Sequence, residues 1–79
     1  MLNKLREYFE TECSKMETLL KRSDWAQANV EKVVKATIHE FCGAATFVML
    51  ADSSLNYTKV NPIFETYRRQ LEFLLDKYS

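Results

Sequence analysis

Residues 41–51 read Phe-Cys-Gly-Ala-Ala-Thr-Phe-Val-Met-Leu-Ala, and no charged side chain interrupts this run. The run closes a longer segment without proline, and we expect this segment to form one helix over residues 24–51. On a helical wheel at about 100° per residue, one side of the segment forms an apolar stripe that suits a protein core. The stripe consists of Val30, Val34, Thr37, Phe41, Ala44, Ala45 and Val48. This long central helix is the element around which the rest of the fold is predicted.

Two further helices are predicted beside the central one, over residues 2–22 and 61–78. The first carries an apolar stripe of Leu2, Leu5, Phe9, Met16, Leu19 and Leu20. The last carries a stripe of Phe64, Tyr67, Leu71, Leu74 and Tyr78. The sequence therefore predicts a single all-α domain over residues 1–79, built as an antiparallel three-helix bundle.

Short polar signals set the expected helix boundaries. Asp24, followed three residues later by Gln27, resembles a capping box and predicts the start of the central helix. Asn61 followed by Pro62 predicts an N-cap and a first helical residue for the last helix. The polar segment 52–60 is then expected to be a loop.

Composition limits the classes of function. The 79 residues are 47% hydrophobic, which is too apolar for intrinsic disorder, and 11 basic residues balance 11 acidic ones, which argues against a polyelectrolyte binder. We expect a soluble, cytoplasmic protein without a membrane span, because the apolar run 41–51 is about half of the length that a bilayer requires. Cys13 and Cys42 are expected to be reduced, small core residues.

The back of the central helix is the most informative feature of the sequence. It begins as an ordinary polar face with Glu31, Lys32 and Lys35, but it turns apolar over its last three turns. A helix that is apolar on all sides needs neighbours on all sides, and this chain predicts no fourth helix. Because burying one large apolar side chain is worth about 1.5–3 kcal/mol, we expect a homodimeric six-helix assembly. The expected interface residues are Ala36, His39, Glu40, Gly43, Thr46, Phe47, Met49 and Leu50.

Gly43 is expected at the centre of that interface. A glycine inside a helix costs about 1 kcal/mol relative to alanine, and Gly43 lies in line with Ala36 and Leu50 at seven-residue steps. Small residues in such a line let two helix backbones approach each other closely. His39 is expected at the margin of the interface, beside Glu40, where its protonation would weaken the dimer by bringing like charges together. A different protein covering this face is the alternative.

A second surface is predicted on the outer side of the last helix. Phe73 faces away from the core stripe, and Arg69 and Lys77 lie one turn to either side. Aromatic residues and arginine are typical anchors of protein interfaces, so we expect contact with a protein partner. The alternative is a nucleic-acid-binding regulator that uses Arg68, Arg69, Lys59 and Phe73, because aromatic and basic groups also stack on bases and bind phosphates.

The sequence predicts no catalytic, cofactor or metal site. His39 and Cys42 form only an H-x-x-C pair, whereas zinc requires four ligands, or three and a water. A small dimeric helical enzyme is the second alternative, and it would need Glu12, His39 or Arg6 to converge in one pocket. We therefore predict a small non-enzymatic interaction or regulatory protein, of a bacterial, phage or mobile-element type.

Overall fold

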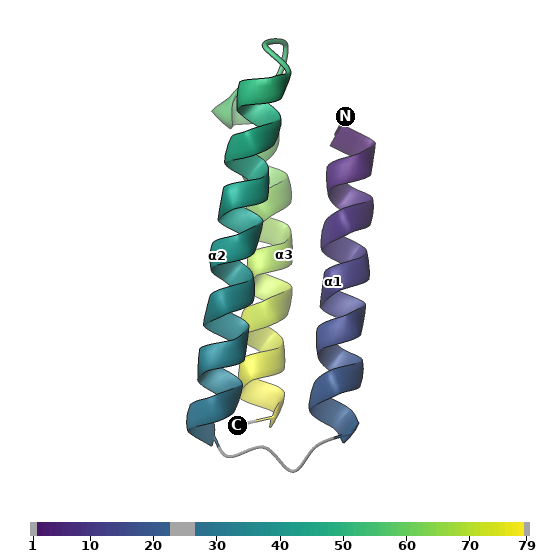
Figure 1. Cartoon of the computed structure of the whole chain (residues 1–79), viewed down its shortest axis with the longest axis vertical. Helices are drawn as coiled ribbons and strands as arrows, with labels where there is room; N and C mark the ends of the chain where they lie inside the picture. Colours follow the sequence, from purple (N-terminus) through teal and green to yellow (C-terminus); the bar gives the residue numbers. More distant parts are fainter. Residues whose placement is uncertain (1, 23–26, 79) are drawn as a thin grey trace.

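The computed structural model describes residues 2–22 and 27–78 and contains three helices. These are α1 (Leu2–Arg22), α2 (Gln27–Ala51) and α3 (Tyr57–Tyr78). They pack together into a rod of about 43 × 18 × 16 Å, and the described residues include no strand (Figure 1). The all-α, three-helix prediction is therefore confirmed.

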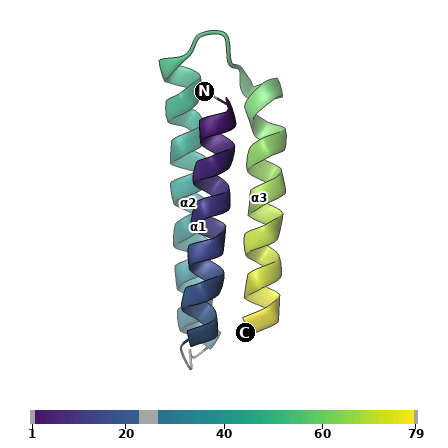
Figure 2. The same ribbon diagram turned by 90° about the vertical axis from the view of Figure 1, so that its right-hand side faces the viewer.

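The chain runs along the rod three times. The start of α1 lies at the same end of the rod as the connection between α2 and α3 (Figure 1). The end of α3 lies at the opposite end, beside the end of α1 and the start of α2 (Figures 1 and 2). Each helix thus runs along most of the rod, and every helix contacts the other two.

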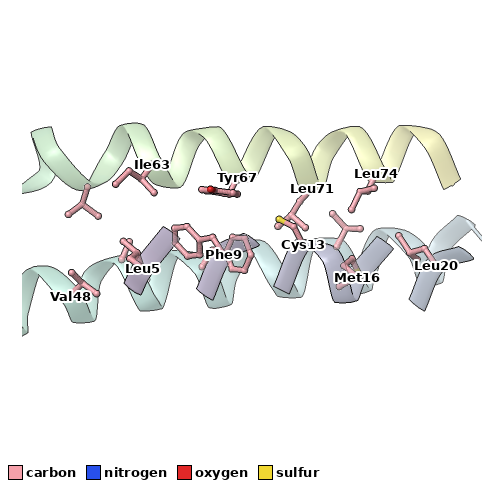
Figure 3. Packing of buried hydrophobic residues seen from close by; sticks show 14 of the residues in the cluster. Leu5, Phe9, Cys13, Met16, Leu20, Val48, Ile63, Tyr67, Leu71 and Leu74 are labelled. Atoms are coloured by element: carbon pink, nitrogen blue, oxygen red, sulfur yellow. The ribbon is translucent and has the colours of Figure 1, made fainter. Parts of the chain in front are cut away.

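Aromatic rings form the centre of the core. The rings of Phe9 and Phe41 are stacked at 4.3 Å between centroids, and the Tyr67 ring lies 5.5 Å from Phe9. Figure 3 shows α1 side chains, with Phe9 and Cys13 among them, facing α3 residues such as Tyr67 and Leu71. All members of the predicted central stripe are buried except Ala44, which is half-buried. The remaining core members are Leu5, Met16, Leu20, Val60, Ile63 and Leu74.

Two predicted core residues are exposed instead. Leu19 is 42% exposed, and the thiol-bearing Cys42 is also exposed, so the prediction that both cysteines lie in the core is wrong for Cys42. The reason is the same in both places, because neighbouring helical residues point about 100° apart. Leu20 and Phe41 take the core positions, which turns Leu19 and Cys42 outward.

The last helix begins four residues earlier than predicted. Asn56 caps α3, since its Oδ1 accepts a hydrogen bond from the Lys59 amide at 3.1 Å and its carbonyl accepts one from Val60 at 3.0 Å. Pro62 consequently lies inside α3 rather than at its first position. The expected start of α2 at Asp24 lies outside the described residues.

The loop between α2 and α3 is correspondingly short, and it is held by Asp52. The Asp52 carboxylate accepts hydrogen bonds from the amide of Ser54 at 3.0 Å and from its hydroxyl at 2.6 Å. These bonds lower the pKa of Asp52 below its ordinary value. These hydrogen bonds therefore hold the loop in place directly after the apolar last turns of α2.

Candidate interaction surfaces

The outer face of α2 carries the two most exposed large apolar side chains of this helix, Phe47 and Leu50. We call this the α2 outer face, and it consists of Ala36, His39, Glu40, Gly43, Thr46, Phe47 and Leu50. All seven are exposed, and the side chains of Phe47 and Leu50 are 68% and 82% exposed. Exposing one large apolar side chain is common in soluble proteins, but two within one turn of the same helix form a patch.

Met49, the eighth predicted interface residue, lies elsewhere. It is half-buried, packs against the core and lines a groove of about 360 Å³ between α2 and α3. The groove is also lined by Cys42, Ala45, Thr46, Tyr57, Val60, Asn61, Phe64 and Glu65. Met49 therefore belongs to the flank of the patch and to the core margin.

Gly43 has neither a conformational nor a packing role within the chain. Its φ angle is not positive, so any residue could adopt its backbone conformation. A Cβ atom placed on Gly43 would meet no heavy atom within 4 Å beyond its own helical surroundings. The single chain alone therefore gives no structural reason for a glycine at this position.

A second groove borders the patch on the side of α1. It has a volume of about 260 Å³ and lies beside the exposed Phe47 ring. Its lining is Lys4, Leu5, Tyr8, Ala44, Phe47 and Val48. The open apolar surface thus extends from α2 onto both neighbouring helices.

Polar groups on α2 are distributed unevenly along the helix. Lys35 pairs with Glu31 at 3.2 Å in the first half, and the last turn contains no basic residue. Near the patch, the Thr46 hydroxyl donates a hydrogen bond to the Cys42 carbonyl of its own helix at 2.9 Å. The carboxyl end of α2 carries the partial negative charge of a helix end, and no basic side chain in its last turn offsets that charge.

One helix segment among the described residues, Ala28–Ala51, is long and apolar enough to cross a membrane by length and composition. Only 28% of the most apolar window of this segment is buried in the bundle. The same property is met by core helices of soluble proteins, and α2 supplies the central core stripe here.

The predicted partner contact on α3 borders a groove with α1. Phe73 is 65% exposed, and it lines this groove of about 530 Å³ together with Arg69. The other lining residues are Glu10, Cys13, Ser14, Glu17, Gln70 and Leu74. Lys77 reaches across to Glu17 at 3.5 Å. The predicted trio therefore lies along one groove, but acidic side chains of α1 share it.

Two of the four groups proposed for nucleic-acid binding, Arg68 and Lys59, are engaged within the chain. The Arg68 guanidinium lies between the carboxylates of Glu65 and Glu72, and its Nε is 3.2 Å from both Glu65 oxygens. These carboxylates raise the pKa of Arg68 further, and Arg68 lowers that of Glu65. Lys59 donates to the Ser54 carbonyl at 3.3 Å. Arg68 and Lys59 would therefore have to leave partners within the chain to bind a phosphate backbone.

The candidate catalytic residues have three separate settings. Glu12 pairs with Lys15 at 3.7 Å, whereas Arg6 lies in a groove with Tyr67 on the α3 side of α1. His39 is exposed on the α2 outer face. Within the described ranges, no three His, Cys, Asp or Glu residues are grouped so that they could hold a metal ion.

One polar contact of the core margin was not predicted from the sequence. The Tyr67 hydroxyl donates a hydrogen bond to the Glu10 carboxylate at 2.9 Å, and burial raises the pKa of this phenol. Spacing within one helix could not reveal it, because the two residues lie on different helices.

Comparison of the chain with protein-family models, with curated proteins and with solved structures found no significant match.

Proposed function

We propose that this chain is a small non-enzymatic interaction protein that acts as a homodimer, with the α2 outer face as its self-association surface. Each chain would be an antiparallel three-helix bundle, and the two copies together would form a six-helix assembly. Pairing of two such faces would remove Phe47 and Leu50 from water, worth about 1.5–3 kcal/mol for each fully buried side chain.

The open surroundings of Gly43 carry this proposal. A glycine in the middle of a helix costs about 0.5–1 kcal/mol relative to alanine. Neither the φ angle nor crowding within the chain requires it here. Close approach by a neighbouring helix is the remaining structural use of a residue without a side chain, and exposed apolar side chains lie one to two turns further along the same face.

Sedimentation equilibrium of Gly43→Leu tests the proposal. The wild-type chain of 9.3 kDa is expected to sediment at twice its mass at micromolar concentration. Gly43→Leu is expected to shift it toward the monomer, because the added side chain separates the helices. At concentrations where the wild type is dimeric, the variant should also melt lower, since association stabilises the folded chain by mass action.

A matched variant separates this effect from added bulk. Thr11→Leu places the same side chain on an exposed position of α1 and should leave the mass unchanged. In dilute solution, where both chains are monomeric, Gly43→Leu should be at least as stable as the wild type, because leucine has the higher helix propensity. A monomeric wild type, or a dimeric Gly43→Leu, would contradict the proposal.

The groove between α1 and α3 is a second candidate surface, for a protein partner. The exposed Phe73 ring beside a mixed-charge groove suits an interface anchor with a polar rim. Affinity capture with wild-type chain and with Phe73→Ala tests it, and Tyr57→Ala, another highly exposed aromatic position, is the control. A captured protein that is retained by Phe73→Ala would not be a partner of this groove.

A further inference from the structure

We infer that the two α2 helices of the proposed dimer run in opposite directions, with Gly43 of each copy at the crossing point. This inference rests on the proposed self-association and adds its direction and register. It follows from three kinds of complementarity along the α2 outer face, each of which is lost when the helices run in the same direction.

The first kind is size. Ala36 and Leu50 each lie seven residues from Gly43, in opposite directions along the helix, which is about 10.5 Å. In an antiparallel pair, Leu50 of each copy lies level with Ala36 of the other. The most exposed apolar side chain of the face then meets one of its smallest, twice per dimer. A parallel pair would instead set Leu50 against Leu50 and leave the two alanines facing each other across a gap.

The second kind is hydrogen bonding. His39 and Thr46 lie four and three residues from Gly43, so an antiparallel pair sets them at nearly the same level. The Thr46 hydroxyl donates to the Cys42 carbonyl, which leaves its oxygen free to accept a hydrogen bond from an imidazole N–H. A parallel pair would place His39 opposite His39. In the antiparallel pair the two imidazoles lie about 12 Å apart along the helix, which removes the like-charge contact.

The third kind is charge. Three of the four charged residues of α2 lie in its first half, Glu31, Lys32 and Lys35, and the fourth, Glu40, lies just past its middle. In an antiparallel pair, Lys35 lies level with Ala51 of the second copy, at the carboxyl end of a helix whose last turn has no basic residue. That end carries a partial negative charge, and a nearby lysine stabilises it. A parallel pair would set Lys35 against Lys35.

A pair that crosses at Gly43 sets residues 35–51 of the two α2 helices side by side, over about 24 Å of helix. A bilayer is the competing environment for an apolar helix of this length, but it would have to accept the four charged residues Glu31, Lys32, Lys35 and Glu40. The second copy covers the apolar half of α2, while Glu31 and Lys32 lie beyond the overlap of the two helices and stay beside water.

Thiol cross-linking between two different chains tests the orientation. Both chains carry Cys42→Ser, so that the exposed native thiol does not react, while the buried Cys13 stays in place. One chain also carries Ala36→Cys and the other Leu50→Cys. After mixing, a short bismaleimide reagent of about 8 Å is added, and the cross-linked species are counted by mass spectrometry. The mass of each variant is measured by sedimentation at the same concentration.

We expect cross-links between the two different chains to exceed those between identical chains by at least tenfold. In the antiparallel register, identical positions lie about 21 Å apart, out of reach of the reagent. Dimers in which Ala36→Cys links to itself, and Leu50→Cys to itself, would overturn the inference but leave the self-association standing.

Chains that sediment as monomers and form no cross-link would refute both the inference and the proposed function. A flotation assay of the wild type with phosphatidylcholine and phosphatidylglycerol vesicles completes the test. Recovery of the chain on the vesicles as a monomer would identify lipid as the cover of α2 and would equally overturn the inference. Its recovery in solution as a dimer supports it.

Discussion

Cys13 illustrates how burial controls chemistry at the level of one residue. Burial among the three helices, with additional repulsion from Glu10 and Glu12, raises the pKa of its thiol from 9.0 to about 11. Cys42 is exposed and lines the groove between α2 and α3. A maleimide added at neutral pH is therefore expected to modify Cys42 rapidly and Cys13 only when the bundle opens.

The same thiol predicts a pH dependence of stability. The folded pKa lies above the unfolded one, so the fold favours the neutral form, and this contribution is complete below about pH 9. It is lost as the pH rises toward 11, where the unfolded chain releases the proton more readily. The melting temperature should fall across this window. Tyr67 adds to the fall, because burial raises its pKa as well.

Cys13→Ala isolates the contribution of the thiol. This variant should melt lower at every pH because it leaves a cavity, but its melting temperature should fall less steeply between pH 9 and 11. Cys42→Ala, at the exposed position, should reproduce the wild-type slope. Identical slopes for all three chains would show that the Cys13 thiol does not contribute.

At the residue scale, the helical wheel predicted the core stripe of α2 well and its margins less well. A stripe requires only the order of residues, so Val30, Val34 and Phe41 could be assigned from spacing. Whether Leu19 or Leu20 faces inward depends on where the neighbouring helices lie, and spacing within one helix does not contain that information. The Tyr67–Glu10 hydrogen bond was missed for the same reason.

At the scale of elements, the start of α3 shows tertiary packing overriding a local signal. Asn61 and Pro62 form a common helix start, but α3 begins at Tyr57 and Asn56 caps it. The extra turn brings Val60 into the core, where it is 1% exposed. Burial of that side chain is worth about 1.5–3 kcal/mol, which offsets much of the roughly 3 kcal/mol that a proline inside a helix costs.

Substitution of the cap residue Asn56 tests where α3 begins. Asn56→Ala removes the side-chain acceptor of the Lys59 amide and should destabilise the chain by about 1 kcal/mol, or roughly 4–8 °C in melting temperature. Asn29→Ala, at an exposed position within α2, is the matched control and should be neutral or slightly stabilising. Equal effects of the two substitutions would place the start of α3 elsewhere.

At the scale of the whole molecule, two phenylalanines have opposite expected roles. Phe9 is fully buried in the ring cluster, and Phe9→Ala should cost about 3–5 kcal/mol, close to the total stability of a small domain. Phe47 lies on the α2 outer face, so Phe47→Ala should change the stability of the dilute chain by less than about 0.5 kcal/mol.

The dependence of the melting temperature on protein concentration distinguishes the effect of Phe47→Ala from that of Phe9→Ala. Wild-type melting temperature should rise with protein concentration, because dissociation precedes or accompanies unfolding of a dimer. Phe47→Ala should weaken this dependence while the circular dichroism of the dilute chain stays unchanged. A wild type whose melting temperature is independent of concentration over a hundredfold range would contradict self-association.

The sequence indicated the three-helix architecture and the apolar back of α2, because both follow from periodicity along one chain. The spacing of apolar residues does not show which molecule covers the α2 outer face. The identity of that molecule depends on how Gly43, Phe47 and Leu50 match a surface in another molecule, and only the shape of the bundle made that match testable.

Three exposed apolar side chains, Phe47, Leu50 and Tyr57, belong to the last turns of α2 and the first turn of α3. Figure 1 shows that the end of α2 and the start of α3 lie at the same end of the rod. An isolated chain is therefore amphiphilic, as a surfactant is, because apolar side chains are exposed at this end of the rod. Very dilute solutions should lose protein to plastic walls and air–water boundaries, and a trace of mild non-ionic detergent should prevent the loss by occupying that end.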